Sequence, residues 1–525
     1  MNGRPKMENL ALRCDKRRTL WILLFVLLFM AFVLLTVPLG SIFRISGDEK
    51  FELMKAFLVS KGFALYSQIW NDQPPLHTAL LAELFRLFGP SVLTARLLGL
   101  GFASIFLVSF MTNVARFEGV VTAYLAAIYL LFAYIVFRLF LSAMLEVPTF
   151  SLALLSTALL CGWKFRRRWL WLVASGLVAG VSLMVKMTGA LLFPALAFEI
   201  VWSVWKQSKS APFRQAAFAL AVWTFPMFLV IGITILLFSG MSIDQLIAPH
   251  FLKIRPGITS RDLKLSIPFL WSSSSYLFLP AFVGVTLRIL DGRFSTIRIP
   301  SFWFVTIFIA HLLHQPFWGF YYLHFAIPLA WLAAVGLKEL FLHAKAVFQD
   351  PGSKVTHRLG WTAFLALVII SSMPAGGLYL WKDYQAIRFS PHIQDFTIVK
   401  LLSKYRDRIH WVYTDNLFLA FYAQVKVPPE LAVVSLKRIN STHLTTKVII
   451  QILKHYRPEM IVLPIYKTKT PEWKRFLQSY EFLEAQGLYA ALALKDFIDS
   501  GLANAKNKTP GITQYEAPKQ DKEKL

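Results

Sequence analysis

The sequence predicts a mainly α-helical membrane protein with about eleven transmembrane helices and a small C-terminal α/β domain. Of the 525 residues, 56% are hydrophobic and only 16% are charged, and the mean hydropathy is +0.54. An ordinary soluble domain has about 25% charged residues. Many apolar runs approach the roughly 20 residues that a membrane-spanning helix needs. The composition excludes a disordered chain, a coiled coil and a conventional soluble enzyme.

The first predicted span covers residues 20–43 and follows a basic cytoplasmic tail, 1–19. The tail resembles the start of a signal peptide. The apolar run is long, however, and no cleavage site with small residues follows it at once, so we expect an uncleaved helix. The remaining spans are expected at 92–113, 118–137, 147–164, 169–185, 188–205, 215–238, 267–290, 300–315, 320–342 and 359–380.

The charges between the spans predict their orientation. An odd number of spans from a cytoplasmic N-terminus places the C-terminal domain outside the cytoplasm. The loops assigned to the inside are then all basic, as is typical of cytoplasmic loops. Their cations are Arg116, Lys164, Arg166, Arg167, Arg168, Lys206, Lys209, Arg214, Arg293, Arg298, Lys345, Lys354 and Arg358. In a membrane protein, the net charge of +26 therefore does not indicate nucleic acid. The two cysteines, Cys14 and Cys161, are too few for a disulfide framework.

Three segments are predicted to lie outside the cytoplasm. Two of them belong to the transmembrane region 20–381, and the third follows it. The first, 44–90, contains two short amphipathic stretches, 49–61 and 75–88, which we expect to lie as helices at the membrane interface. The second, 239–266, is basic. A solvated loop is one interpretation of it and an anion-gathering loop is another. Its cations are Lys253, Arg255, Arg261 and Lys264. The third is the C-terminal domain.

The C-terminal domain is expected over 382–502, followed by a disordered tail, 503–525. Its patterns alternate between helical and extended, which is typical of a small α/β domain. Helices are expected at 395–405, 416–425, 442–456 and 471–480, and extended segments at 409–413, 431–436, 460–464 and 489–494. Two glycosylation sequons begin at Asn440 and Asn507.

Two adjacent carboxylates, Asp48 and Glu49, follow the first span in S-G-D-E-K. From spacing alone they are a solvated acidic pair at the start of a helix, where carboxylates suit the helix dipole. Four further motifs give this pair a context. They are G-F-A-L-Y-S (62–67), W-N-D-Q-P-P-L-H (70–77), L-F-G-P-S-V-L-T-A-R-L (87–97) and H-Q-P-F-W-G-F-Y-Y-L-H-F-A-I-P (314–328).

In these motifs and their order, the chain resembles the GT-C superfamily of membrane glycosyltransferases. The likeness is to family 39, the protein O-mannosyltransferases and the lipid A aminoarabinose transferases, and it is strong over about residues 40–190. The resemblance implies a GT-C transmembrane domain and an inverting glycosyltransferase. The donor would be a polyprenyl-phosphate-linked sugar. The acceptor on the outer face would be a glycolipid, lipopolysaccharide, cell-envelope glycan or protein.

The resemblance also implies roles for particular residues. Asp48 matches the general base, with Glu49 as a supporting or orienting carboxylate. Glu146 matches a second acidic residue, for which many relatives carry aspartate; pairing with Arg138 is the structural alternative. Lys186 matches a cation near the donor phosphate, and a lysine extending to the membrane surface is the alternative. The other candidates for donor or phosphate binding are Tyr66, Gln73, Tyr321, Tyr322 and His324.

Several features limit these expectations. Tyr321, Tyr322 and His324 also suit an aromatic belt at the membrane surface, and Arg96 suits a structural anchor. The aminoarabinose transferases typically carry a lysine where this chain has Gln73, which weakens an assignment to lipid A. The segment 239–266 is too short for the domain inserted in eukaryotic O-mannosyltransferases. His311 and His314 share a helix face without a visible third metal ligand, so no metal site is assigned and divalent-ion dependence stays open.

Two other classes compete with a transferase. A transporter or flippase for glycolipid or polyprenyl-linked substrates would also span the membrane many times, but such proteins usually show internal repeats and charges within the spans. A receptor or anchor would need only one span. We expect a bacterial inner membrane protein, with its active site and C-terminal domain outside the cytoplasm. Its expected partners are a lipid-linked donor, an outer acceptor and the bilayer, without nucleic acid.

Overall fold

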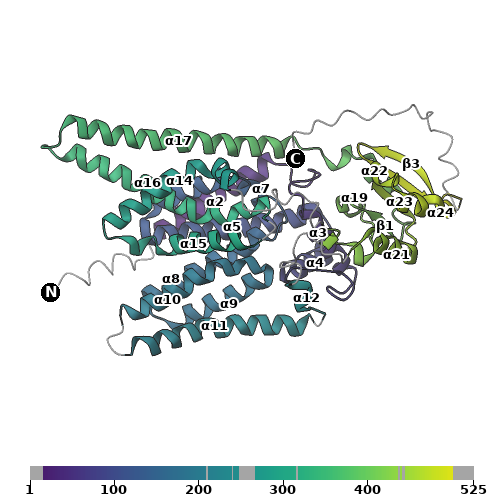
Figure 1. Cartoon of the computed structure of the whole chain (residues 1–525), viewed down its shortest axis with the longest axis horizontal. Coiled ribbons are helices and arrows are strands. Elements are labelled where there is room, and N and C mark those ends of the chain that lie inside the picture. The colour runs from purple at the N-terminus through teal and green to yellow at the C-terminus, as the bar shows by residue number, and fades with distance from the viewer. Residues whose placement is uncertain are drawn as a thin grey trace.

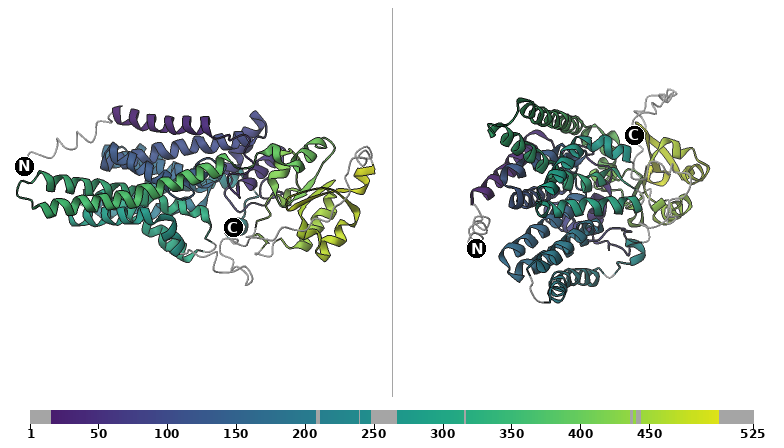
Figure 2. Two further views of the ribbon diagram at one scale, coloured as in Figure 1. Left: turned by 90° about the horizontal axis from the view of Figure 1, so that it is seen from above. Right: turned by 60° about the vertical axis from the view of Figure 1, so that its left-hand side comes forward.

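A long helical bundle carries a small α/β domain at one end (Figure 1). The computed structural model describes residues 16–207, 211–238, 240–247, 267–314, 317–435, 438–439 and 444–499. Views from two further directions place the α/β domain beyond the ends of the bundle helices (Figure 2). The predicted fold class, a mainly helical membrane protein with a small C-terminal sheet, is confirmed.

Apolar helices build the bundle. In the part of the chain that the structure describes, eight helices are long and apolar enough to cross a membrane, and three apolar helices are shorter. Every predicted span overlaps one of them, and the number of crossings stays a prediction. The eleven are α2 (Lys16–Thr36), α5 (Val92–Glu118), α6 (Val120–Phe132), α8 (Glu146–Arg166), α9 (Trp169–Val185), α10 (Phe193–Trp205, preceded by the 3-10 turn Met187–Leu192), α11 (Pro212–Leu237), α14 (Ile267–Leu290), α15 (Arg298–Leu313), α16 (Tyr322–Gln349) and α17 (Val355–Arg388).

The outer surface of the bundle is apolar. Leu35 on α2 is 85% exposed, Leu236 on α11 is 81% exposed and Ile370 on α17 is 68% exposed. Water would oppose the exposure of so many large apolar side chains, whereas lipid tails solvate them. A helix also satisfies most of its backbone hydrogen bonds internally, as a segment in a bilayer must, although α11, α14, α16 and α17 each contain an internal proline.

Two glycines allow α14 and α16 to cross closely. A Cβ atom on Gly336 would lie 1.8 Å from the carbonyl oxygen of Pro280, and one on Gly284 would lie 2.6 Å from that of Leu332. Both distances are below van der Waals contact, so a side chain at either position would force the helices apart. The crossing holds α16, which begins directly after an aromatic segment at the end of the bundle next to the α/β domain.

The first outer segment folds as two short helices, α3 (Glu49–Ser60) and α4 (Leu76–Phe88), as predicted. They lie between the bundle and the α/β domain (Figure 1). The rings of Phe57 on α3 and Phe85 on α4 both pack on Phe421, at centroid distances of 6.1 and 5.7 Å. Phe421 belongs to the α/β domain, so this apolar contact joins the two parts of the molecule. Their position at a membrane interface stays a prediction.

The α/β domain contains a four-stranded sheet in the order β1-β2-β4-β3. β1 and β2 run parallel, and the other neighbours are antiparallel. The strands are β1 (Val412–Thr414), β2 (Met460–Pro464), β3 (Tyr480–Gln486) and β4 (Tyr489–Leu494). The main helices are α18 (Thr397–Lys404), α19 (Leu417–Tyr422), α21 (Thr446–Tyr456), α23 (Pro471–Phe476) and α24 (Lys495–Asp499).

Two predicted elements of this domain are wrong. The segment predicted as extended over 431–436 forms no strand among residues 431–435. A 3-10 turn, Pro429–Leu431, precedes it, and the prolines Pro428 and Pro429 have no N–H groups for a sheet. The helix predicted over 471–480 ends at Phe476, and β3 begins at Tyr480. Gly487, with φ of 57°, turns β3 into β4, a hairpin that helical spacing did not reveal.

The domain is anchored where the first span leaves the bundle. α17 continues to Arg388, beyond the predicted boundary at 381. The following residues bind the chain after α2: the N–H of Phe43 donates to the Pro391 carbonyl at 2.9 Å. The ring of Phe43 stacks on Phe396, with centroids 3.7 Å apart, and the Tyr422 hydroxyl donates to the Phe43 carbonyl. These contacts lie five residues before Asp48 and fix the path of the chain toward it.

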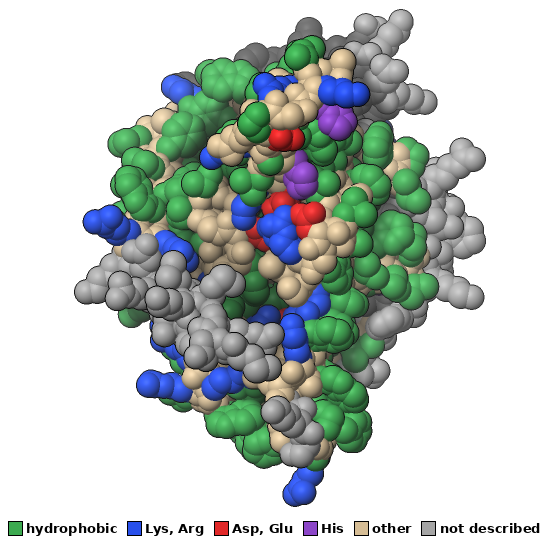
Figure 3. All heavy atoms as spheres, turned by 90° about the vertical axis from the view of Figure 1, so that its left-hand side faces the viewer, with side chains coloured by type: hydrophobic (Ala, Val, Ile, Leu, Met, Phe, Trp, Pro, Cys, Tyr) green, Lys and Arg blue, Asp and Glu red, His purple; other side chains and the backbone are tan. Residues whose placement is uncertain are grey.

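The end of the bundle away from the α/β domain displays many lysines and arginines (Figure 3). Most of the acidic side chains visible there gather near its centre. Glu118 and Glu339 are buried and share Arg288 as a partner, and Lys338 also binds Glu118. Their charge is therefore neutralised internally, and the cations dominate this end. The predicted orientation, with this end in the cytoplasm, stays a prediction.

Several predictions lie outside the described residues. They concern Cys14 and most of the tail 1–19, the second outer segment with Lys253, Arg255, Arg261 and Lys264, the sequons at Asn440 and Asn507, and the tail 503–525.

Candidate active site

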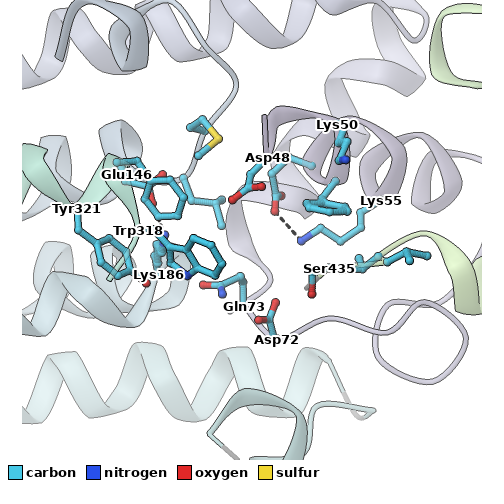
Figure 4. A pocket seen from close by; sticks show the side chains of 17 residues that line it. Asp48, Lys50, Lys55, Asp72, Gln73, Glu146, Lys186, Trp318, Tyr321 and Ser435 are labelled. Atoms are coloured by element: carbon cyan, nitrogen blue, oxygen red, sulfur yellow. Dashed lines mark hydrogen bonds and ion pairs between the residues drawn. The ribbon is translucent and has the colours of Figure 1, made fainter. Parts of the chain in front are cut away.

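A cavity of about 280 Å³ lies where the bundle meets the α/β domain (Figure 4). Five parts of the chain line it besides Lys186: the start of α3, the loop before α4, the start of α8, residues 318–321 before α16, and residues 433–435 of the α/β domain. Five of these six regions contain a residue that the sequence analysis singled out as a site candidate: Asp48, Gln73, Glu146, Lys186 and Tyr321. The fold therefore brings together residues that are up to about 390 positions apart.

Asp48 extends into the middle of this cavity (Figure 4). It is the residue before α3, and its side chain makes no cap hydrogen bond to that helix. Its carboxylate is open to the cavity although protein surrounds it. Burial and the nearby charge of Glu146 raise the pKa of Asp48 above its usual value, while Lys186 and Lys50 oppose the shift. A carboxylate with a raised pKa holds a proton more strongly, which suits a general base.

Glu146 and Lys186 form a buried ion pair in the cavity wall. Glu146 begins α8, and Lys186 lies between α9 and the 3-10 turn that follows it. The Lys186 ammonium also lies over the rings of Phe320 and Tyr321, at 4.9 and 5.5 Å from their centroids. Lys186 is only 7% exposed, so it does not extend to the membrane surface.

Arg138 does not pair with Glu146, contrary to the structural alternative. Its guanidinium binds Asp383 on α17 at 3.0 Å instead. One oxygen of the buried Glu146 carboxylate, Oε2, has no hydrogen-bond partner among the described residues. The contact that the structure shows for the Glu146 carboxylate is therefore its ion pair with Lys186.

Glu49 points away from the cavity. It is fully buried, and Arg96 binds both of its oxygens at 2.9 Å. Arg96 also donates to the carbonyls of Leu39 and Ile42, each at 2.7 Å, and the N–H of Ala143 donates to Glu49 at 3.1 Å. The pair ties α3 to α5, to the end of the first span and to the loop before α8. Glu49 thus orients the chain next to Asp48, and Arg96 is the structural anchor that the sequence suggested.

Tyr66 and Gln73 act together in the loop before α4. Gln73 lines the cavity, whereas Tyr66 lies behind it and is buried. The Tyr66 hydroxyl donates to the backbone carbonyl of Gln73 at 2.7 Å, and the Asn71 amide donates to the same carbonyl at 2.6 Å. Tyr66 has φ of 74°, a left-handed conformation that is uncommon for tyrosine. Tyr66 therefore shapes the loop that presents Gln73, and it does not line the cavity itself.

Of the three aromatic candidates near α16, only Tyr321 lines the cavity. Tyr322 is buried, and its ring packs edge-on against Tyr134 with centroids 5.6 Å apart. His324 is fully buried, and its Nδ1 atom is 2.9 Å from Nε2 of His311. His311 thus pairs with a histidine on the next helix. The aromatic-belt alternative does not fit Tyr322 and His324, because neither reaches the surface.

Several known proteins share this fold. Residues 72–231 match the family model described as dolichyl-phosphate-mannose-protein mannosyltransferase. ArnT from Cupriavidus metallidurans bound to undecaprenyl phosphate gives a TM-score of 0.56 at 16% identity, over 90% of this chain and 98% of that chain. The apo form gives 0.59 at 14% identity, over 90% and 97%.

An archaeal protein aligns as well. The oligosaccharyltransferase AglB from Archaeoglobus fulgidus, in complex with an inhibitory peptide and a dolichol-phosphate, gives a TM-score of 0.53 at 13% identity, over 92% of this chain and 75% of that chain. The chain has the GT-C fold. At these identities the structural likeness concerns the fold alone. No curated protein matches the sequence.

This GT-C fold also places residues in the cavity that the sequence did not single out. The most polar are Lys50, Glu52 and Lys55 on α3. Glu52 binds Lys55 at 2.6 Å. Burial raises the pKa of Glu52, but Lys55 and His77 lower it more strongly, to about 2. The spacing of three between Glu52 and Lys55 was a sequence signal for such a pair. Trp318 lies within the quoted motif at 314–328 but was not singled out, and residues 433–435 carried no comparable signal.

Four carboxylates line the GT-C cavity: Asp48, Glu52, Asp72 and Glu146. No three residues among His, Cys, Asp and Glu come together as a metal site in the described ranges. Glu146 is neutralised by Lys186 and Glu52 by Lys55, so neither offers a free carboxylate to a cation. The cavity instead combines the carboxylate of Asp48, the cation of Lys186 and an aromatic wall.

Proposed function

We propose that the protein is an inverting glycosyltransferase that moves a sugar from a polyprenyl-phosphate carrier to an acceptor hydroxyl on the outer face of the membrane. One observation carries this proposal: the cavity places Asp48 across from the buried Glu146–Lys186 pair, at the outer end of the bundle (Figure 4). Such a transfer needs a base for the acceptor hydroxyl and a cation for the leaving phosphate, and both groups face this cavity.

The reaction assigns a role to each side of the cavity. The acceptor oxygen attacks the anomeric carbon while its proton passes to the Asp48 carboxylate. The bond from that carbon to the phosphate oxygen breaks, and the phosphate leaves with the electron pair. The Lys186 ammonium stabilises the negative charge on the leaving phosphate. Attack opposite to the leaving group inverts the anomeric configuration.

The surroundings of the cavity favour one direction of entry for each substrate. Lys186, Trp318 and Tyr321 belong to the bundle side, where the lipid tail of a donor can stay in the membrane. The lipid carriers in the ArnT and AglB structures are undecaprenyl phosphate and a dolichol-phosphate. Lys50, Asp72 and Ser435 line the opposite side, next to the α/β domain. We assign this side to the acceptor.

The α/β domain closes the acceptor side through residues 433–435. Arg438 fixes this segment by donating to the carbonyl of Val433 at 3.0 Å, and its backbone N–H donates to the Ser435 hydroxyl at 3.2 Å. The Arg438 guanidinium also lies over the ring of Trp70, 4.8 Å from its centroid. Trp70 begins the W-N-D-Q-P-P-L-H motif, so one arginine holds both the domain segment and the loop that presents Gln73.

A transporter or flippase is not favoured. The GT-C fold and the match of residues 72–231 to a mannosyltransferase model support the transferase. The buried charges of the cavity also gather at one end of the bundle, whereas a transport path needs groups near the middle of the membrane. We further propose a bacterial inner membrane location, with the cavity and the α/β domain outside the cytoplasm. The basic opposite end of the bundle supports that orientation.

Lys186→Ala is expected to raise the KM for the lipid-linked donor by about 10- to 100-fold, because a hydrogen bond to a charged group contributes about 1.5–3 kcal/mol. The turnover number of Lys186→Ala should fall less than that of Asp48→Asn, which lacks the proposed base. The measurement is steady-state kinetics with purified protein and varied donor. An unchanged donor KM together with an unchanged rate would contradict a phosphate contact.

A double variant separates binding from structure. Removing Lys186 leaves Glu146 buried without its partner, which destabilises the protein by itself. In Lys186→Ala/Glu146→Gln both charges are absent. Recovery of thermal stability without recovery of donor KM would assign the loss to the phosphate contact.

Mass spectrometry of envelope glycans and glycolipids tests the proposed function as a whole. The strains are a deletion host that expresses the wild-type protein and the same host with Asp48→Asn at equal expression. We expect the mutant to lose one defined sugar mass, which would identify the sugar and the acceptor together. The proposed transferase function is rejected if two results occur together. The two strains have identical profiles, and the purified wild-type protein transfers no sugar from mixed polyprenyl-phosphate-linked sugar donors.

A further inference from the structure

A second cavity, of about 680 Å³, lies at the end of the bundle opposite Asp48. It opens between the turn that joins α8 to α9 and the described residues around the end of α10 and the start of α11. Its walls combine the aromatic side chains of Trp163, Trp169 and Phe218 with two cations, Arg167 and Arg214. Nothing in the proposed sugar transfer uses this cavity.

The two arginines carry positive charge that the cavity does not neutralise. No carboxylate lines the cavity among the described residues. The buried acid of the neighbouring helix α10 is Glu199, and it already binds Lys164 at 2.5 Å and Arg298 at 3.0 Å. The guanidinium of Arg167 lies 5.2 Å from the ring centroid of Trp163, which holds it at the cavity. An anionic ligand would meet two cations without displacing an acidic side chain.

The surroundings indicate that this ligand is a lipid. Large aromatic side chains beside the cavity are exposed: Trp169 is 47% exposed, Trp205 is 56%, Phe218 is 59% and Phe213 is 79%. Such aromatic groups gather where a membrane meets water, at the level of the lipid headgroups. The cavity thus offers cations to a headgroup and apolar surface to the acyl chains that continue from it.

We propose that this cavity binds the headgroup of an acidic phospholipid from the membrane leaflet opposite the Asp48 cavity. The headgroup phosphate lies between Arg167 and Arg214, and the acyl chains run along α9 and α11. Basic pockets between transmembrane helices are suited to anionic headgroups. The bound lipid would join two helix pairs, α8–α9 and α10–α11, that meet at this end.

The test uses the purified full chain, stripped of lipid in a non-ionic detergent. Native mass spectrometry measures binding of dioctanoyl phosphatidylglycerol, dioctanoyl phosphatidylcholine and inorganic phosphate. The test variant is Arg167→Gln/Arg214→Gln. The matched control is Arg166→Gln/Arg168→Gln, which removes the same charge from the same end, and neither of its residues lines the cavity. We expect the wild-type protein to bind the glycerol lipid at least about tenfold more tightly than the choline lipid.

The variants decide the outcome. The preference for phosphatidylglycerol should disappear in the test variant and persist in the control, and in the wild-type protein it should weaken at high salt. This salt dependence keeps the test valid if the double variant fails to fold. Equal affinity for both lipids, or an equal loss in the control variant, would overturn the proposal. So would displacement of the lipid by inorganic phosphate at comparable concentration, which would indicate a site for a soluble anion.

Discussion

Asp48→Asn is expected to lower the rate of sugar transfer by roughly a thousandfold, within the 100- to 10,000-fold range that a positioned general base contributes. Asparagine keeps the shape of the side chain and cannot accept the acceptor's proton. Asp48 makes no helix-cap hydrogen bond, so its replacement removes no structural contact of that kind. Single-turnover transfer by the purified variant measures the effect, and its thermal unfolding should match that of the wild-type protein. Near-normal turnover would remove Asp48 as the base.

The pH profile gives an independent check on the same residue. Because the pKa of Asp48 is raised, kcat/KM should begin to fall at a higher pH than the usual aspartate value of 3.8 as the pH is lowered. Lys50 lowers the pKa of Asp48, so Lys50→Met should move this acid limb to still higher pH. A limb that stays in place in Lys50→Met would indicate that another group controls the rate.

Arg96→Met is expected to destabilise the protein by about 3–5 kcal/mol, because it leaves Glu49 buried with an uncompensated charge. Arg96 is fully buried and binds Glu49 through two hydrogen bonds at 2.9 Å. Its loss also frees the carbonyls of Leu39 and Ile42 at the end of the first span. The measurement is the free energy of unfolding in detergent, or the yield of folded protein when unfolding is irreversible.

Two controls test the cause of this loss. In Glu49→Leu/Arg96→Met both charges are absent, so a substantial part of the stability should return. Arg86→Met removes an exposed arginine that pairs with Glu83 on α4, and it should cost less than about 1 kcal/mol. If Arg96→Met costs no more than Arg86→Met, the buried pair does not stabilise the outer segment.

The sequence alone determined the class of the protein. The apolar runs predicted eleven helices, and each run overlaps an apolar helix. Patterns of this kind are readable because the need to bury or solvate each side chain repeats along the helix itself. The family resemblance implied nine site residues, and five of them, Asp48, Gln73, Glu146, Lys186 and Tyr321, line one cavity, whereas Glu49, Tyr66, Tyr322 and His324 do not.

Only the tertiary structure separated residues that look alike in the sequence. Asp48 and Glu49 are adjacent carboxylates, yet Asp48 faces the cavity while Glu49 binds Arg96, which is 47 positions away. Tyr321 and Tyr322 are likewise adjacent, yet Tyr321 lines the cavity while Tyr322 is buried outside it. Neighbours on a helix point in different directions, and the protein packed around the helix decides which direction leads to an ion pair and which to the cavity.

The contribution of the α/β domain to the cavity was also decided by packing. Residues 433–435 were predicted as a strand, because their local pattern is apolar and extended. In the structure these residues form no strand. Arg438 holds them beside the loop that contains Trp70, a residue more than 360 positions earlier in the chain. A local pattern records how much of a side chain is buried. It does not record against which distant segment the side chain is buried, and that partner is chosen only when the whole chain packs.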